Sequence, residues 1–421
     1  MRELVFGREP AHFIWATGIE DTFVPQTKAG HRALDEYALM GHYEHWRTDL
    51  SLLSETNVKA VRWGIPWYRV EPFHGQFDWS WTDQVIPYLV EDLKVTPIVD
   101  LMHYGCPFWL RNEFANDYYP RAVADYAAAF AERYKHLIRL FTPLNEPLVT
   151  ALMCGKRGLW PPYLKEDSGY VRILLQIVRG VLNTVEALKQ IDPAFIIVQV
   201  EATGLSRAIR NDLEPLAIEQ QRRGYLFYDL ITGSVNPDHP LFDWLLTSGA
   251  MAREIEEIAA RRIPIEILGM NFYPQWSTQQ IYINRQGRLC FRPIEHDGAG
   301  FISLIEDYYQ RYRAPIMITE TSALGTDEIR SRWLTESIAA VKSLRFRGIP
   351  IVGFTWFPLF TMVDWRYRLG RRPAEYYYID LGLYKIDPLP DGQRRWNKTL
   401  LVEQLKGYIR DPVESVGAMN I

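Results

Sequence analysis

Two glutamates follow short apolar segments in a way that suggests acid–base chemistry. Glu146 lies in the stretch Phe-Thr-Pro-Leu-Asn-Glu-Pro, and Glu320 lies in Pro-Ile-Met-Ile-Thr-Glu-Thr. Cleaving a glycosidic bond with retention needs two such groups about 5–5.5 Å apart, one acid to protonate the leaving oxygen and one carboxylate to attack the anomeric carbon. The simpler interpretation is that each glutamate only pairs with an arginine. Their positions at the ends of two different candidate strands favour the catalytic interpretation.

Other side chains have the chemistry to support such a pair. Asn145 could hydrogen-bond a sugar 2-hydroxyl, a contact that strengthens in the transition state. Arg62 could keep the nucleophile ionised by its charge, and Tyr273 could do so by a hydrogen bond. His103 could bind sugar hydroxyls and Trp356 could lie under a sugar ring, although a buried core histidine and plain core packing are the competing interpretations. We therefore predict Arg62, Asn145 and Tyr273 as catalytic support.

These residues lie on short apolar segments that alternate with amphipathic ones. The apolar segments are rich in Val and Ile and mostly continuous, which suits parallel strands buried on both faces. The candidate strands are Phe13–Thr17, Val58–Trp63, Thr96–Leu101, Leu140–Leu144, Phe195–Val200, Ile265–Asn271, Ile316–Thr319 and Ile351–Trp356. Helix-like segments include His42–Thr56, Ala122–His136, Tyr170–Gln190 and Asp327–Arg347.

Strand–helix alternation along the whole chain predicts an α/β fold with a single (β/α)8 TIM barrel, formed by residues 1–421 as one catalytic domain. In such barrels the catalytic groups lie where the strands end, so the polar residues that close the candidate strands should meet at one rim. A doubly wound open sheet is the alternative fold. It lacks support because no G-x-G-x-x-G turn follows the first candidate strand.

Composition limits the classes of partner. The net charge of −4 gives no reason to expect nucleic acid or an anionic membrane as a partner. The chain has 14 Trp and 24 Tyr, which fits a core rich in large side chains or a sugar site lined by aromatic faces. Cys106, Cys154 and Cys290 match no zinc or disulfide pattern, and we expect no metal and no cofactor. The N-terminal segment lacks an apolar signal-like region, so we expect a cytoplasmic protein.

The ordered motifs resemble those of glycoside hydrolase family 1, the β-glucosidase-like family, from about Phe13 to Leu400. The stretches, with the family pattern in parentheses, are Arg62–Pro72 (R-x-S-x-x-W-x-R-x-x-P), Asp100–Pro107 (T-L-x-H-W-D-x-P), Thr142–Pro147 (T-F-N-E-P), Gly269–Tyr273 (G-x-N-Y-Y), Ile318–Glu320 (I-T-E-N-G) and Gly382–Asp387 (G-L-x-x-V-D). The resemblance implies a retaining barrel enzyme with Glu146 as acid/base and Glu320 as nucleophile.

The chain departs from the family pattern where the family binds its terminal sugar. The first strand of the family ends in Q-x-E-G, but here the stretch is Gly-Ile-Glu-Asp. Either Glu20, Asp21 or Gln26 substitutes for the missing Gln, or the contact is absent. The late segment W-S-L-L-D-N-F-E-W becomes Trp356–Trp365, one residue longer and with Asp364 in place of Glu. We predict the substrate-binding residues as Glu20, Asp21, Gln26, His103, Trp356, Asp364 and Trp365.

The predicted function is that of a retaining β-glycosidase that hydrolyses O-glycosidic bonds, acting from the end of a small glycoside or oligosaccharide whose terminal sugar is not necessarily glucose. One alternative is a retaining relative in the same clan that acts inside polysaccharide chains. Another is a sugar-binding barrel without activity, which is less favoured because both carboxylates persist. The basic residues Arg366, Arg368, Arg371 and Arg372 form either a solvated loop or a pocket for an anionic sugar. The sequence neither supports nor excludes a homo-oligomer.

Overall fold

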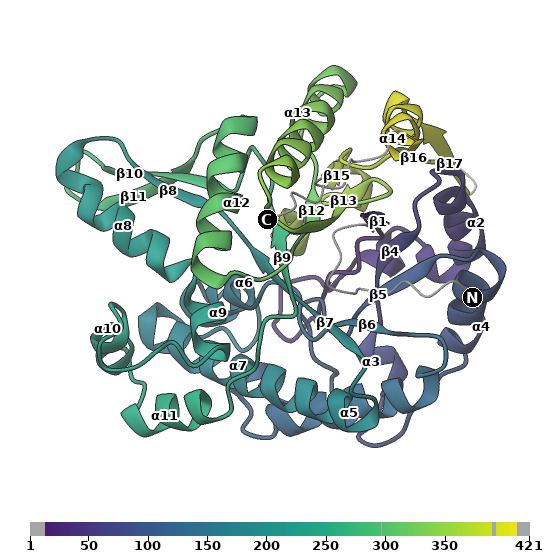
Figure 1. The fold of residues 1–421 in the computed structure, drawn as a ribbon. Coiled ribbons are helices and arrows are strands. Elements are labelled where there is room, and N and C mark those ends of the chain that lie inside the picture. The colour runs from purple at the N-terminus through teal and green to yellow at the C-terminus, as the bar shows by residue number, and fades with distance from the viewer. Residues whose placement is uncertain (1–12, 296, 390–392, 411–421) are drawn as a thin grey trace, which may run out of the picture.

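The computed structural model describes residues 13–295, 297–389 and 393–410. Eight parallel strands close a barrel at the centre of the molecule (Figure 1). The strands are β1 (Ile14–Gly18), β4 (Ala60–Gly64), β5 (Thr96–Asp100), β6 (Leu140–Thr142), β7 (Ile196–Ala202), β9 (Ile267–Asn271), β12 (Ile316–Thr321) and β13 (Ile351–Trp356). Each lies within two residues of a predicted segment. The barrel prediction is confirmed, and the open sheet is excluded because β1 pairs with both β4 and β13.

The four predicted helices are also present, as α2 (His42–Glu55), α5 (Tyr119–Tyr134), α7 (Glu166–Ile191) and α13 (Asp327–Phe346). The longest of them, α7, carries Glu166 and Asp167 in its first turn and Lys189 in its last, an arrangement that complements the helix dipole. It has a buried stripe that includes Ile173 and Leu174, and the helix packs along α5 at the bottom of Figure 1. The helices thus cover the outer face of the barrel.

The remaining elements fill the connections between barrel strands. The other helices are α1 (Glu36–Leu39), α3 (Trp67–Val70), α4 (Thr82–Pro87), α6 (Pro147–Ala151), α8 (Glu214–Arg223), α9 (Leu226–Ile231), α10 (Phe242–Thr247), α11 (Ala252–Ala260), α12 (Gly298–Tyr312) and α14 (Leu400–Arg410). The smaller sheets join β2 (Phe23–Val24) to β3 (Leu34–Asp35), β14 (Met362–Val363) to β15 (Tyr378–Ile379), and β16 (Tyr384–Pro388) to β17 (Arg394–Lys398). A three-stranded sheet of β8 (Leu205–Ala208), β10 (Thr278–Ile283) and β11 (Leu289–Pro293) lies with α8 beside the barrel (Figure 1).

The barrel interior changes from apolar to polar along its strands. A closed apolar cluster fills the interior, formed by Ile14, Ala16, Ala60, Ile98, Leu140, Val198, Val200, Ile267 and Met317. Side chains two residues apart on a strand point to the same side. Arg62 therefore lies one layer above Ala60, and Asp100 one layer above Ile98, toward the ends of their strands. Both are fully buried, so the top layer of the barrel is charged.

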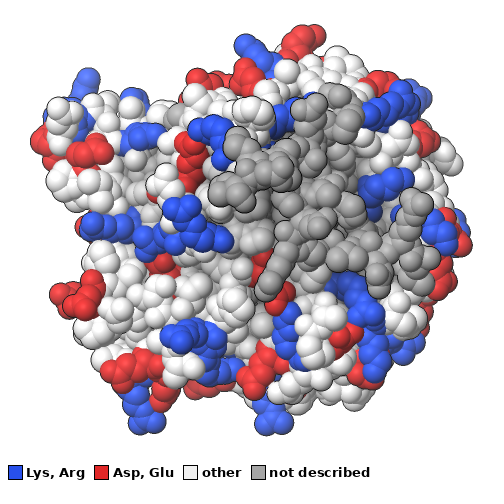
Figure 2. All heavy atoms as spheres, in the orientation of Figure 1, with Lys and Arg blue, Asp and Glu red and all other residues white. Residues whose placement is uncertain are grey.

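The outer surface mixes both signs of charge. In the described part of the face in Figure 2, Lys and Arg side chains are interspersed with Asp and Glu. This arrangement is in keeping with the net charge of −4. None of the helices in the described part of the chain is long and apolar enough to span a membrane.

Candidate active site

Glu320 is turned into the barrel by an irregularity in β12. Ile318 pairs with Met270 of β9, but the next pair in the ladder joins Glu320 to Asn271, so β12 has one extra residue at this point. A bulge of this kind re-aims the side chains that follow it. Met317 already faces inward, and without the bulge Glu320 would face outward, because side chains alternate along a strand. The extra residue therefore places the carboxyl at the interior rim, where it is 4% exposed.

Two donors hold the Glu320 carboxyl. Arg62 donates from Nη1 to Glu320 Oε1 at 2.5 Å, and the Tyr273 hydroxyl donates to Oε2 at 2.6 Å. Arg62 also donates from Nη2 to Asp100 Oδ2 at 2.6 Å and to Asn145 Oδ1 at 2.9 Å. Burial opposes the charge on Arg62, but the carboxylates of Asp100 and Glu320 outweigh it and raise the pKa of the guanidinium. A permanently charged Arg62 thus links strands β4, β5 and β12.

Glu146 lies in a different environment. It follows β6 directly before α6 and has a left-handed backbone with φ of 50°, which is uncommon outside glycine. Asn271 donates from Nδ2 to Glu146 Oε1 at 2.8 Å, and Tyr104 donates its hydroxyl proton to Oε2 at 2.5 Å. Burial and the nearby charge of Glu320 raise the pKa of Glu146 to about 7, against these two hydrogen bonds. Glu146 can therefore hold a proton near neutral pH.

His103 lies at the other side of the same network. Its Nδ1 is 2.7 Å from Asp21 Oδ1, and its Nε2 is 2.9 Å from Asn145 Nδ2. Burial opposes protonation of the imidazole, but Asp21 and Asp100 hold the pKa of His103 well above its ordinary value. The nearby Glu20 Oε1 accepts hydrogen bonds from the backbone and side chain of Thr22. His103 is thus part of a charged network and not an isolated core histidine.

Asp21 reaches His103 through a space that a missing side chain leaves open. A Cβ atom on Gly64 would lie 1.5 Å from Asp21 Oδ2, so no residue larger than glycine fits there while Asp21 keeps this position. In a similar way, a Cβ atom on Gly18 would lie 2.3 Å from the ring of Phe357. Gly18 occupies the place where the family pattern has Gln. The ring of Phe357 therefore fills the region that a longer side chain would enter.

The network brings together donors that could in principle bind a metal. Asp21, Asp100 and His103 offer ligand atoms within 4.8 Å of one another, which their spacing in the sequence did not predict. However, Asp100 Oδ2 accepts a hydrogen bond from the Arg62 guanidinium, and Asp21 pairs with His103. A fixed cation next to these oxygens opposes a second one by charge repulsion. We interpret the group as a charge network that orients His103 and Arg62.

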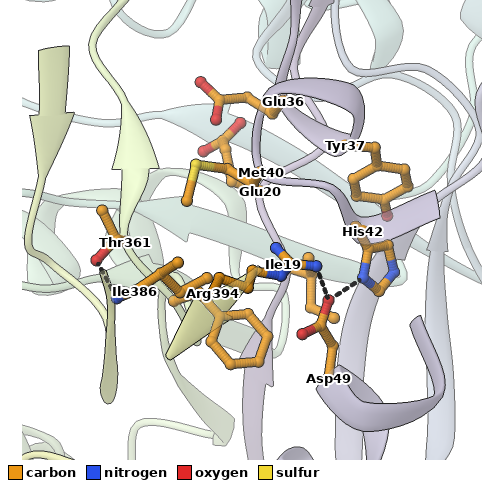
Figure 3. A pocket seen from close by; sticks show the side chains of 11 residues that line it. Ile19, Glu20, Glu36, Tyr37, Met40, His42, Asp49, Thr361, Ile386 and Arg394 are labelled. Atoms are coloured by element: carbon orange, nitrogen blue, oxygen red, sulfur yellow. Dashed lines mark hydrogen bonds and ion pairs between the residues drawn. The ribbon is translucent and has the colours of Figure 1, made fainter. Parts of the chain in front are cut away.

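A small cavity lies behind Glu20, between β1, α1, α2 and the β16–β17 hairpin (Figure 3). Figure 3 shows the carboxyls of Glu20 and Glu36 on one side of it and Arg394 with Asp49 on the other. Burial raises the pKa of Glu36 well above its ordinary value, and both of its carboxyl oxygens accept from the backbone N–H of Val363. The cavity adjoins the predicted site through Glu20 only, and neither Glu146 nor Glu320 lines it.

The remaining predicted site residues are spread more widely. Gln26 is exposed, and Trp356 is fully buried with its indole N–H donating to Leu381 O at 3.0 Å. Asp364 caps the following turn by accepting from the backbone and side chain of Arg366. Trp365 packs against Tyr104, with ring centroids 5.4 Å apart. Of these four residues, Trp365 alone contacts a side chain that hydrogen-bonds Glu146.

The basic residues after Trp365 have separate roles. Arg366 is paired with Asp364, with Nη2 2.6 Å from Oδ2. Arg368 is buried and donates to the backbone carbonyls of Val24, Pro25 and Arg32. These two side chains are therefore engaged in holding loops together. Arg371 and Arg372 are exposed.

Three residues of the network were not among the predicted site residues. Asp100, Tyr104 and Asn271 each hydrogen-bond a predicted residue directly. Asp100 and Asn271 end strands β5 and β9, so the rule that strand ends carry the chemistry was a signal for them. Tyr104 lies beyond the strand end, and its role follows only from the fold of the loop.

Comparison with known proteins supports the same assignment. Residues 16–203 match the sequence profile of Glycosyl hydrolase family 1. The chain is 25% identical to β-glucosidase A of Thermotoga maritima over 82% of both chains, and 20% identical to the aryl-phospho-β-D-glucosidase BglA of Bacillus subtilis over 86% of this chain and 83% of that protein.

The fold matches solved structures closely. The structure of the β-glucosidase from Thermotoga maritima in complex with castanospermine superposes with a TM-score of 0.79 at 17% identity, covering 95% of this chain and 97% of that chain. At this identity the likeness concerns the barrel fold. The profile match, the relatives and the ordered motifs indicate a glycoside hydrolase whose sequence is similar to family 1.

Proposed function

We propose that the protein is a retaining β-glycosidase in which Glu146 is the general acid/base and Glu320 is the nucleophile. The observation that carries this proposal is the contrast between the two carboxyls. Glu320 receives a hydrogen bond from a guanidinium and one from a hydroxyl, both of which favour its ionised form. Glu146 has its pKa raised to about 7 by burial and by Glu320. Environments that differ in this way assign one acid and one nucleophile.

The proposed reaction uses these groups in two steps. In the first, the Glu320 carboxylate attacks the anomeric carbon while protonated Glu146 gives its proton to the leaving oxygen, which forms a glycosyl-enzyme. In the second, ionised Glu146 takes a proton from water as the water displaces Glu320, so the sugar leaves with its configuration retained. The side-chain oxygen of Asn145 accepts hydrogen bonds from Arg62, which contacts Glu320, and from Asn271, which contacts Glu146. Asn145 therefore lies between the two carboxyls, where it can bind a sugar 2-hydroxyl. Carboxyl groups carry out both steps, so the proposal invokes no cofactor.

We further propose action at the end of a small glycoside or oligosaccharide. The similarity to proteins named β-glucosidases supports this mode, and action inside a polysaccharide is the alternative. The terminal sugar is proposed to differ from glucose, because Gly18 stands where the family has Gln and the Phe357 ring occupies the space that the Gln side chain would need. The relative named aryl-phospho-β-D-glucosidase raises the option of an anionic sugar, but Arg366 and Arg368 are engaged with protein groups. A panel of neutral and anionic chromogenic β-glycosides tests this, and a wide lead for the β-glucoside would contradict it.

Azide rescue of two variants tests the roles of the carboxyls. With a 2,4-dinitrophenyl glycoside, Glu146→Ala should still form the glycosyl-enzyme, because this leaving group needs no proton. Azide should then attack that intermediate and give a glycosyl azide of retained β configuration. Glu320→Ala forms no intermediate, so azide takes the place of the nucleophile and gives the inverted α azide. The two configurations are distinguished by the proton coupling at the anomeric carbon.

The reverse pattern, with the β azide from Glu320→Ala and the α azide from Glu146→Ala, would mean that the roles are exchanged. Failure of the unmodified enzyme to cleave any member of the panel would favour the inactive sugar-binding barrel. Inversion at the anomeric carbon by the unmodified enzyme would exclude the double displacement. These outcomes are measured on the unmodified enzyme and on the single variants Glu146→Ala and Glu320→Ala.

A further inference from the structure

Tyr104 makes a contact with Glu146 that the family pattern does not contain. The similar family stretch has Trp at this position, and an indole carries no hydroxyl. Here the Tyr104 hydroxyl donates to Glu146 Oε2 at 2.5 Å and accepts from Asn145 Nδ2 at 3.1 Å. Burial and the charge of Glu146 raise the pKa of Tyr104 well above its ordinary value, so the hydroxyl keeps its proton and is the donor. The hydrogen bonds therefore run from the Asn145 amide to the Tyr104 hydroxyl and from that hydroxyl to the Glu146 carboxyl.

The backbone and the surrounding rings fix Tyr104 in this position. The residue has a φ of 87°, in the left-handed region that side chains other than glycine rarely adopt, and it is 2% exposed. Its ring packs edge-on against His103, with centroids 4.6 Å apart, and lies 5.0 Å from the ring of Trp160. A residue held in an unfavourable conformation is a reason to look for a functional role. The ring cannot turn its hydroxyl away without disturbing these contacts.

We propose that Tyr104 is a positioning residue for the acid/base, whose hydroxyl orients the Glu146 carboxyl and stabilises its ionised form. This inference rests on the proposed role of Glu146. Its consequence is a balance between the two half-reactions. Burial and Glu320 favour the protonated acid that the first step needs, and the Tyr104 hydroxyl favours the carboxylate that the second step needs. Once Glu320 is bonded to the sugar its charge is lost, so the donor then acts without opposition from it.

Other groups also act on Glu146, and all of them stay in place when the hydroxyl alone is removed. These groups come from strands β5, β7, β9 and β12 or from the loops that follow them. They are Glu320, His103, Glu201, Tyr273 and the amide of Asn271. Arg62 reaches it indirectly through Asn145. The variant Tyr104→Phe keeps the ring and deletes the donor. A comparison of Tyr104→Phe with the unmodified enzyme therefore isolates one hydrogen bond.

The test is the pH dependence of the two steps. With a 4-nitrophenyl glycoside, kcat/KM reports the first step, and its decline at alkaline pH reports the loss of the proton from Glu146. With a 2,4-dinitrophenyl glycoside, kcat reports the second step when that step is slow, and its decline at acid pH reports protonation of the same group. Loss of a donor to the ionised form should move both limbs upward by roughly one pH unit in Tyr104→Phe. A role in packing alone would lower the rates and leave both limbs in place.

Tyr119→Phe is the matched control. Tyr119 is buried, and its hydroxyl contacts Met102 Sδ at 3.6 Å and not Glu146. Its pH limbs should coincide with those of the unmodified enzyme. If Tyr104→Phe is poorly folded by thermal unfolding, Tyr104→Leu supplies an apolar side chain without any hydrogen-bond donor and should show the same upward shift. Limbs that stay in place or move downward in the folded variant would overturn the proposal. Failure of Glu146→Ala to give the β azide would instead overturn the role of Glu146 itself.

Discussion

At the scale of single residues, the site separates two glutamates by what surrounds them. Glu320 lies against Arg62 and Tyr273, so its charge is balanced as soon as the chain folds. Glu146 is buried, and its carboxyl accepts hydrogen bonds from the neutral side chains of Tyr104 and Asn271 and not from a cation. The energy that keeps a proton on Glu146 therefore comes from burial and from the neighbouring negative charge, and both can be measured by titration of activity.

The first prediction concerns that titration. In the proposed mechanism Glu146 carries a proton in the first step, and its pKa is raised to about 7 by burial and by Glu320. Activity that depends on the protonated acid is present below this pKa and is lost as the pH rises through it. We expect kcat/KM of the unmodified enzyme to fall above about pH 7, approaching a tenfold decrease per pH unit. Glu146→Gln, measured with the same 4-nitrophenyl glycoside at its lower residual rate, should lack this alkaline limb. A limb that persists in Glu146→Gln would assign it to another group.

At the scale of elements, small irregularities decide where the functional groups point. The extra residue in β12 turns Glu320 inward. Glu146 itself has a left-handed backbone directly before α6, which turns its side chain inward. At the ends of β1 and β4, Asp21 fills the space beside Gly64. The family pattern has the opposite arrangement, with Gly where this chain has Asp21 and Ser where it has Gly64. The two differences are therefore expected to depend on each other.

The second prediction tests this dependence. Gly64→Ser should push the Asp21 carboxyl away from His103, because its Cβ would lie 1.5 Å from Asp21 Oδ2. We expect kcat/KM to fall by about 100-fold or more, as misplaced site groups commonly cause. In the double variant with Asp21→Gly the clash is absent, so part of the loss should be regained and the two effects should not add. Gly407→Ala, which meets no atom within 4 Å, is the control for an added methyl group. Strictly additive losses would contradict the proposed coupling.

At the scale of the whole molecule, buried carboxyls outside the network make stability depend on pH. Glu113 lies in the short turn Glu113–Ala115 before α5 and is 5% exposed. Its Oε1 atom has no hydrogen-bond partner in the described part of the chain. Burial raises the pKa of Glu113 to about 8, although the charge of Arg368 opposes this. The folded protein therefore prefers a neutral group at this position.

The third prediction follows from the sign of that shift. The folded pKa of Glu113 is above the unfolded one, so its contribution to stability is present at low pH and is lost as the pH rises toward and through about 8. Glu113→Gln cannot ionise and should avoid this loss. We expect the two proteins to differ little in free energy of unfolding at pH 5, and the variant to be more stable by roughly 2–4 kcal/mol at pH 9. Denaturant unfolding at both pH values measures this, with Glu375→Gln, at an exposed position, as the control. An equal difference at both pH values would contradict the expectation.

The sequence by itself determined the barrel and marked the two glutamates as candidates, because both inferences depend on local patterns. Apolar runs separated by helical segments define eight parallel strands, and polar residues at strand ends mark the rim. The tertiary structure alone decided which groups contact them. The bulge that aims Glu320 at Arg62 and the loop that brings the Tyr104 hydroxyl to Glu146 depend on how strands pair and loops turn. The Tyr104–Glu146 contact joins residues 42 positions apart, and the Arg62–Glu320 contact joins residues 258 positions apart. The contact of Asp21 with Gly64 was also decided by the tertiary structure. The sequence shows that Gly64 lacks a side chain, but only the fold shows that the Asp21 carboxyl occupies that space.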